Sequence, residues 1–333
     1  TYRARQQIRA GYLMSDVTVL KSVTLAGGAR YEVSEQAVES KSPFVTNARE
    51  TDARLRTDDI LPAVNLTWRT TANLNLRAAF SKTLNRPELR ELSPFDMYNY
   101  EMGISEAGNP TLQATTIESY DTRAEFFPAP GEVFAVSVFR KALARPIESS
   151  LQAAGGNKLR IPVNGRDGRL RGFELEARSA LARVSRHLRR LAASANYSRV
   201  ESKARLRSSL DDAGIPVYTE APLQGQSTYA LNLGLYYDDG SLLDGALLFG
   251  AYGKRLSERG VSGTPGAPLP DVYEYPPLSL DVTVGCKVAR GLRAKLAVEN
   301  LLERGAEFRQ LDKIHRRTDP GRSISLSISS GQR

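Results

Sequence analysis

Two carboxylates that stand two residues apart, Glu174 and Glu176, are the sequence's clearest candidates for paired acid and base chemistry. Glycosidases use two carboxyl groups in this way, one as the acid and one as the base or nucleophile. Phe173, Leu175 and Ala177 alternate with them, which is typical of a strand, so both carboxylates lie on one strand face. This placement favours a role for both carboxylates in lining a water-filled interior over a role as a catalytic pair.

The residue types that bind metals or act as nucleophiles are scarce. One cysteine and two histidines exclude a disulfide within the chain and a Cys/His zinc cluster. The sequence contains no phosphate-binding loop, dinucleotide fingerprint or G-x-S-x-G nucleophile elbow. The run 164–168 resembles a calcium-binding loop in composition. It lacks the Glu that binds the ion through both carboxylate oxygens in such loops. We therefore predict no catalytic residue, metal, cofactor or enzymatic activity.

The connection 83–113 carries side chains that suit adaptable binding by stacking and hydrogen bonding. A solvated or self-packed loop is the alternative, because exposed loops are polar in any case. The predicted ligand contacts are Arg90, Glu91, Asp96, Tyr98, Asn99, Tyr100 and Glu101. In another connection, Lys203, Arg205 and Arg207 would either pair with phosphate groups or be solvated.

The elements that position these residues are strands, because apolar and polar residues alternate with a period of two. The run 72–81 places Leu74, Leu76 and Phe80 on one face, with Asn75 and Arg77 on the other. The runs at 173–178, 229–237, 278–285, 292–299 and 323–329 show the same pattern. The charged or polar face gives the predicted lumen-facing set, which is Arg77, Glu174, Glu176, Arg178, Asp281, Arg293, Lys295 and Glu299.

About 13 such runs follow one another, and short turns alternate with long connections. The runs lie near 9–20, 22–33, 58–69, 72–82, 114–128, 131–143, 167–182, 187–202, 224–238, 243–254, 276–288, 291–302 and 320–329. The long connections are 34–57, 83–113, 144–166, 203–223, 255–275 and 303–319. Structureless loops of this length are uncommon in compact soluble domains, whereas a membrane barrel alternates short periplasmic turns with long outer loops.

Composition narrows the class further. The 333 residues include 46 Lys and Arg against 37 Asp and Glu, and the net charge is +9. The basic residues are dispersed along the chain, so we predict no nucleic-acid partner. No apolar stretch of about 18 residues is present, so the sequence does not predict a transmembrane helix.

Six segments, taken in order, resemble the C-terminal barrel of TonB-dependent receptors. The run 81–92 is similar to the family pattern S-x-T-x-x-R-P-x-x-x-E-L, and 108–112 with 120–121 is similar to G-N-P-x-L followed by Y-D. The others are 125–148, with its P-I-E end, the G-x-E-x-E strand at 172–176, the L-x-G-Q-S run at 223–227, and the last hairpin at 298–302 with 321–323. The resemblance covers about residues 60–330.

The resemblance implies an all-β fold, an antiparallel up-and-down transmembrane β-barrel of about 22 strands, of which this chain holds about 13–14. The whole chain, 1–333, would be one C-terminal barrel portion without the plug domain. The implied function is import of a scarce ligand, of the siderophore, vitamin, glycan or peptide class, across the outer membrane of a Gram-negative bacterium. The implied partners are outer-membrane lipid and lipopolysaccharide, the imported ligand, and the TonB-ExbB-ExbD complex acting through the plug.

Two other functions remain open on the sequence. A passive pore or a structural or adhesive outer-membrane barrel would show the same alternation and loop rhythm. A soluble all-β enzyme or sugar-binding module would also alternate, but it would bury the apolar face against a second layer of protein. The position of the apolar face in space therefore decides between a membrane barrel and a soluble fold.

Overall fold

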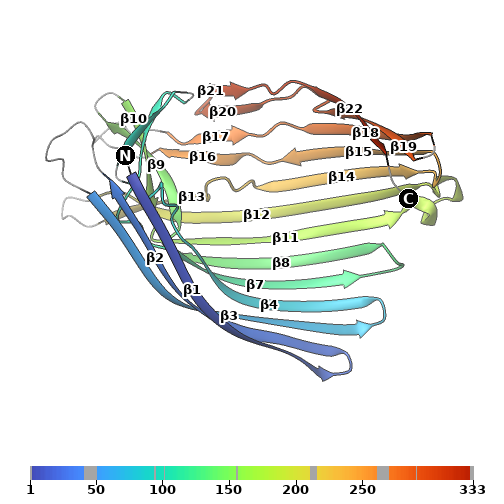
Figure 1. Ribbon diagram of the computed structural model, residues 1–333, viewed down its shortest axis with the longest axis horizontal. Coiled ribbons are helices and arrows are strands. Elements are labelled where there is room, and N and C mark those ends of the chain that lie inside the picture. Colours follow the sequence, from blue (N-terminus) through green and yellow to red (C-terminus); the bar gives the residue numbers. More distant parts are fainter. Residues whose placement is uncertain are drawn as a thin grey trace.

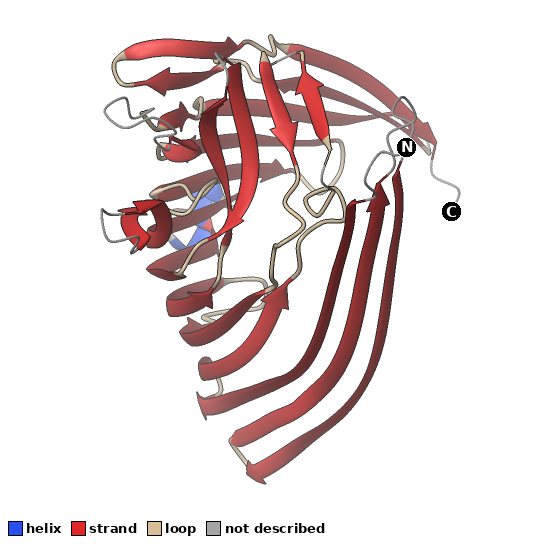
Figure 2. Cartoon of the chain, turned by 90° about the vertical axis from the view of Figure 1, so that its left-hand side faces the viewer, coloured by secondary structure: helices blue, strands red, loops and turns tan. Residues whose placement is uncertain are grey.

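The computed structural model describes residues 2–40, 51–93, 95–100, 102–154, 157–210, 216–260, 270–289 and 291–330. Strands form almost all of the regular structure and are arranged in two sheets. A 14-stranded main sheet curls into an open shell, and an eight-stranded sheet lies at one end of it (Figures 1 and 2). Among the described residues, no helix is long and apolar enough to cross a membrane.

The main sheet is a meander in which strands follow one another in chain order, apart from the excursions into the second sheet. Its path, without β13, contains 13 strands. They are β1 (Tyr2–Leu20), β2 (Val23–Ser40), β3 (Thr51–Thr71), β4 (Leu74–Asn85), β7 (Thr115–Phe126), β8 (Val133–Ala144), β11 (Asp167–Ala180), β12 (Leu191–Leu210), β14 (Tyr229–Asp238), β15 (Leu243–Tyr252), β18 (Ser279–Ala289), β19 (Leu292–Glu299) and β22 (Ser323–Ser330). Each predicted run overlaps one of these strands, which confirms the antiparallel all-β prediction. Within the described residues, no pairing joins β1 to β22.

The second sheet is built from the long connections, which the sequence analysis treated as loops. Its order is β21-β20-β17-β16-β9-β10-β6-β5. The bounds are β5 (Asp96–Asn99), β6 (Ile104–Ala107), β9 (Ile147–Ala154), β10 (Asn157–Asn164), β16 (Arg255–Gly260), β17 (Val272–Tyr275), β20 (Ala306–Gln310) and β21 (Lys313–Thr318), while β13 (Pro216–Ala221) pairs with β12. We call this end of the main sheet the loop end and the opposite end the turn end.

The turns at the turn end are compact, and their backbone N–H groups find hydrogen-bond acceptors within the same turn. The β14–β15 turn places Gly240 at a φ of 77°, and the Asp239 carboxylate accepts the backbone N–H groups of Ser241, Leu242 and Leu243 at 2.7, 2.8 and 3.1 Å. These three donors lower the pKa of Asp239 to about 2. Two 3-10 helices, η1 (Leu181–Arg183) and η2 (Arg186–Leu188), form the β11–β12 turn.

The apolar residues of the alternating runs meet across the strands and form one continuous face. In the register, Val136 lies opposite Leu175, which lies opposite Tyr197. The same face continues through Leu235, Leu247, Val282, Val298 and Ile324. Many of these side chains are exposed, and no second layer of the described residues covers them. A soluble sandwich would bury this face, so its exposure favours contact with hydrocarbon.

The two buried apolar clusters lie at the loop end. One contains Val38, Ala53, Leu92 and Leu112, and the other contains Ala204, Leu206 and Leu223. Both join outward extensions of the main-sheet strands to the long connections. These clusters therefore anchor the second sheet on the main sheet.

Candidate functional site

Four charged side chains from three different long connections meet in the second sheet, and we call them the charge cluster: Arg90, Glu106, Arg160 and Glu258. Arg90 Nη2 donates to Glu106 Oε2 at 2.7 Å. Arg160 donates from Nη1 to Glu106 Oε1 at 3.0 Å and from Nη2 to Glu258 Oε1 at 2.5 Å. The cluster lies where β10 pairs in parallel with β6 over only two residue pairs, so its side chains supplement a short ladder.

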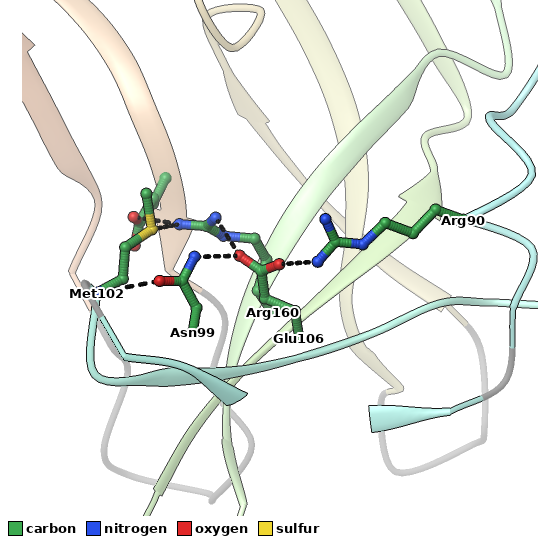
Figure 3. Close-up of polar contacts among 6 residues, drawn as sticks. Arg90, Asn99, Met102, Glu106 and Arg160 are labelled. Carbon is green, nitrogen blue, oxygen red and sulfur yellow. Dashed lines mark hydrogen bonds and ion pairs between the residues drawn. The ribbon is translucent and has the colours of Figure 1, made fainter. Parts of the chain in front are cut away.

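Uncharged side chains complete the hydrogen bonding around this cluster (Figure 3). Asn99 Nδ2 donates to Glu106 Oε1 at 3.2 Å, and its Oδ1 accepts the backbone N–H of Met102 at 3.2 Å. Arg160 Nη2 also contacts Met102 Sδ at 3.3 Å. Glu106 therefore accepts from three side chains, which holds the β5–β6 hairpin against β10.

A cavity of ≈ 200 Å³ lies beside the charge cluster. Arg90, Glu91, Glu106 and Arg160 line it together with the less polar residues Phe95, Met97 and Pro162. Burial raises the pKa of the Glu91 carboxyl, although the backbone N–H of Glu88 donates to it at 2.8 Å and opposes the shift. The cavity thus combines two guanidinium groups, carboxylates and an apolar wall, a mixture that can orient a polar ligand.

The structure places the predicted ligand contacts in different surroundings. Arg90 and Glu91 line the cavity, and Asn99 supports Glu106. Tyr98 and Tyr100 pack edge to face, with ring centroids 4.9 Å apart, and the Tyr100 side chain is 87% exposed. Asp96 begins β5 and is exposed, and Glu101 lies outside the described residues. Their contact with a ligand stays a prediction.

Three cluster residues were missed by the sequence analysis. Glu106 lies in the connection that was singled out, but no motif marked it. Arg160 and Glu258 come from connections about 54 and 152 residues further along the chain, and no spacing links them to Glu106. Only the pairing of strands from different connections brings these three residues together.

The eight predicted lumen-facing residues occupy the face opposite the apolar one. Arg77 Nε donates to Glu125 at 2.9 Å, and Arg123 donates to Glu125 at 2.9 Å and to Glu176 at 2.6 Å. We call Arg77, Glu125, Arg123 and Glu176 the ionic ladder. Among the other predicted residues, Arg293 pairs with Asp244, and Asp281 accepts the backbone N–H of Asn300 at 2.8 Å.

The remaining four are placed on the same face by strand register. Glu174 lies opposite Ser137 and Ser198, Arg178 opposite Ser194, Lys295 opposite Ser327, and Glu299 opposite Ser323. Small polar partners leave room for water beside these charges. That this polar face lines a lumen stays a prediction. In the described part of the chain, no group of three or more His, Cys, Asp or Glu side chains is placed to hold a metal ion.

A buried carboxyl in the second sheet gives this end of the molecule a pH dependence. Glu148 of β9 accepts the backbone N–H of Gln224 at 3.0 Å, while Ser149 exchanges two further hydrogen bonds with the Gln224 amide at 2.7 and 2.6 Å. Burial raises the pKa of Glu148 from 4.5 to about 7, although Arg259 and the Gln224 N–H oppose the shift. The folded state binds its proton more tightly than the unfolded state, so folding loses stability as pH rises from 4.5 to about 7.

Replacement of Glu148 by Gln is expected to remove this pH dependence, because the amide keeps an acceptor for the Gln224 N–H and cannot ionise. Hydrogen exchange of the amides in 147–154 and 223–226, corrected for the intrinsic effect of pH, measures it. Glu303→Gln, at an exposed carboxylate in the same end of the molecule, is the control and should leave the dependence intact. Equal pH profiles for the wild type and Glu148→Gln would contradict the assignment.

Comparison with protein families gives one match over most of the chain. The family model described as TonB dependent receptor-like, beta-barrel, matches residues 1–301. Comparison with curated protein sequences found no match.

Solved structures with a similar fold include siderophore receptors. The ferric enterobactin receptor PfeA of Pseudomonas aeruginosa, in complex with enterobactin, is 17% identical with a TM-score of 0.62, covering 98% of this chain and 54% of that one. The ferric-catecholate import receptor Fiu of E. coli K12 is 13% identical with a TM-score of 0.67, covering 99% and 45%. The siderophore receptor PiuA of Acinetobacter baumannii is 14% identical with a TM-score of 0.69, covering 99% and 44%. The chain thus spans about half the length of these receptors, and at these identities the likeness concerns the fold.

Proposed function

The chain belongs to the TonB-dependent receptor-like β-barrel family, a family of outer-membrane transporters rather than enzymes, and from this premise we propose that it forms the wall and ligand-capture surface of an importer. The loop end would face the outside of the cell and the turn end the periplasm, because long loops lie outside in such barrels. The second sheet and its cavity would then meet the ligand first.

The observation that supports capture at the loop end is the cavity beside the charge cluster. Its polar groups come from separate connections that are fixed by ion pairs and by a second sheet, so the site is largely preformed. A preformed site loses less conformational entropy on binding than mobile loops do. Release into the periplasm would draw energy from the TonB-ExbB-ExbD complex, which acts through a plug domain inside the barrel.

The similar structures suggest which ligand class to consider first. Those receptors are described as binding ferric enterobactin or as importing ferric catecholates, and a cavity with Arg90 and Arg160 suits an anionic chelate. We propose a siderophore-type ligand first, with vitamin, glycan and peptide ligands as the other classes.

Uptake by cells that carry the full-length gene product, with ferric enterobactin as the first probe, tests this function. Uptake that requires the gene and stops when the proton gradient is collapsed is the expected result. The second candidate function is a passive pore or a structural or adhesive barrel, which the exposed apolar face alone would equally permit. Stable conductance of the purified full-length protein in planar bilayers, without energy-dependent uptake of any tested ligand class, would overturn the importer.

A further inference from the structure

Four basic side chains gather on the apolar side of the main sheet, just beyond the apolar band towards the loop end, and we call them the basic rim patch: Arg140, Arg169, Arg171 and Lys203. Arg140 follows the exposed Val138 by two residues on β8, and Arg171 precedes the exposed Phe173 by two on β11. Residues two apart share a strand face. The patch therefore lies on the lipid-facing side, where hydrocarbon gives way to headgroups.

The strand register places like charges directly opposite each other in this patch. Arg171 lies opposite Arg140, and Arg169 lies opposite Lys203. Like charges at directly opposed positions destabilise a sheet. Glu201 pairs with Arg171 at 2.7 Å and Glu220 with Lys203 at 3.3 Å, while Arg140 and Arg169 form no ion pair within the described residues. The patch thus keeps excess positive charge that an anion would neutralise.

The patch surrounds a hollow that continues into an apolar one. The first hollow, of ≈ 440 Å³, is lined by the four basic residues with Leu170, Glu201 and Ser202. The second, of ≈ 740 Å³, shares Arg171, Glu201 and Ser202 with the first and extends along Val136, Val138 and Phe173. A ligand that fits both has an anionic head and apolar chains.

We propose that the basic rim patch binds the phosphate groups of an acylated glycolipid of the outer leaflet, with the acyl chains along Val136, Val138 and Phe173. Arginine presents paired N–H donors that match phosphate oxygens, and basic clusters at a membrane surface select anionic headgroups. The outer leaflet of a Gram-negative outer membrane carries a phosphorylated glycolipid, lipopolysaccharide. The proposal rests on the outer-membrane location of the family and on the outward-facing loop end proposed above, and it is independent of import.

This site differs from the one that the sequence indicated. Of Lys203, Arg205 and Arg207, only Lys203 lines the hollow. Arg205 is paired with Asp167, so its charge is already balanced within the protein. The three arginines of the patch lie on β8 and β11, in runs where the alternation pattern alone gave no reason to group them.

The test compares retained lipid in the full-length protein after extraction from the outer membrane in mild detergent. The triple variant Arg140→Gln, Arg169→Gln, Arg171→Gln is expected to retain lipopolysaccharide at least ~10-fold less than the wild type, because it loses the charge-assisted bonds to phosphate. The control, Arg304→Gln, Lys313→Gln, Arg316→Gln, removes the same charge from the loop end away from the patch and should retain lipid as the wild type does. Heat-modified mobility on gels checks that every barrel folds.

Rebinding in detergent separates the possible sources of the anion. Purified bis-phosphorylated lipid A should bind the wild type more tightly than dephosphorylated lipid A, and the variant Arg140→Lys, Arg169→Lys, Arg171→Lys should keep part of the binding because it keeps the charge. Equal retention by the wild type and the glutamine variant would overturn the proposal. Phosphatidylglycerol bound as tightly as lipid A, or inorganic phosphate bound alone with equal affinity, would overturn the assignment to a glycolipid. Ligand uptake is a separate readout, so its failure leaves this result unaffected.

Discussion

Arginine in place of Leu247 is expected to destabilise the folded barrel in a bilayer by about 2–4 kcal/mol, because it sets a charge on the lipid face near the middle of the apolar band. Leu247 lies opposite Leu235 and Val282, and its side chain is 41% exposed. Hydrocarbon cannot solvate the guanidinium, and none of these neighbours offers a carboxylate. Equilibrium unfolding of the full-length protein from liposomes measures the loss.

The adjacent residue gives a matched control. Leu248 is 38% exposed but points to the opposite face, where Asp281 lies opposite it in β18. Leu248→Arg is expected to cost no more than about 1 kcal/mol, because its charge would meet water and a carboxylate. Similar losses for the two variants would show that the apolar face does not contact lipid, and the membrane orientation of the whole sheet would be wrong.

Loss of Arg160 should have an effect of similar size, and it should be confined to the second sheet. Arg160→Met removes the partner that Glu106 and Glu258 share, and their side chains are only 19% and 12% exposed. Two carboxylates left partly buried without this partner should lower the local stability by about 2–4 kcal/mol, a value reduced from that of a fully buried pair because water still reaches the cluster. Hydrogen exchange of the amides in 104–107 and 255–260 should rise accordingly.

Arg90→Met is the control, because Arg90 binds the same Glu106 but its side chain is 59% exposed. An exposed pair contributes about 0–1 kcal/mol, so exchange in β6 should change little. If binding at the neighbouring cavity depends on the fixed cluster, Arg160→Met should also weaken capture of a ligand more than Arg90→Met. Equal exchange in the two variants would show that the cluster does not hold the strands.

The main sheet could be predicted from the sequence because each strand carries its own signal. The run at 229–237 alternates apolar and polar residues, and β14 follows this run from Tyr229 to Asp238. The alternation of apolar and polar residues becomes weaker where a strand extends beyond the lipid. β2 extends to Ser40, seven residues past the predicted run, and in this extension Gln36 is buried and Val38 packs into a cluster under the connections. Alternation arises where one face of a strand meets an apolar environment and the other a polar one. In this extension of β2 both faces are partly polar.

The second sheet and the charge cluster could not be predicted in this way. Its strands have four to eight residues, and β9 pairs in parallel with β16, more than 100 residues further along the chain, through only two residue pairs. A short strand that is stabilised by distant partners shows no recognisable alternation of apolar and polar residues in its own sequence. The connection 83–113, which the sequence analysis singled out, borders the cavity, although Glu106 was not recognised and ligand contact there stays a prediction.

The ionic ladder has a consequence for any charged solute that passes the polar face. Its two cations and two anions alternate in contact, so their fields cancel a short distance away, within the screening length of about 8 Å at physiological salt. This stretch of wall neither attracts an ion from afar nor repels it. Directional guidance of a charged cargo must then come from elsewhere, and the ladder acts only as a surface of close-range hydrogen-bonding groups.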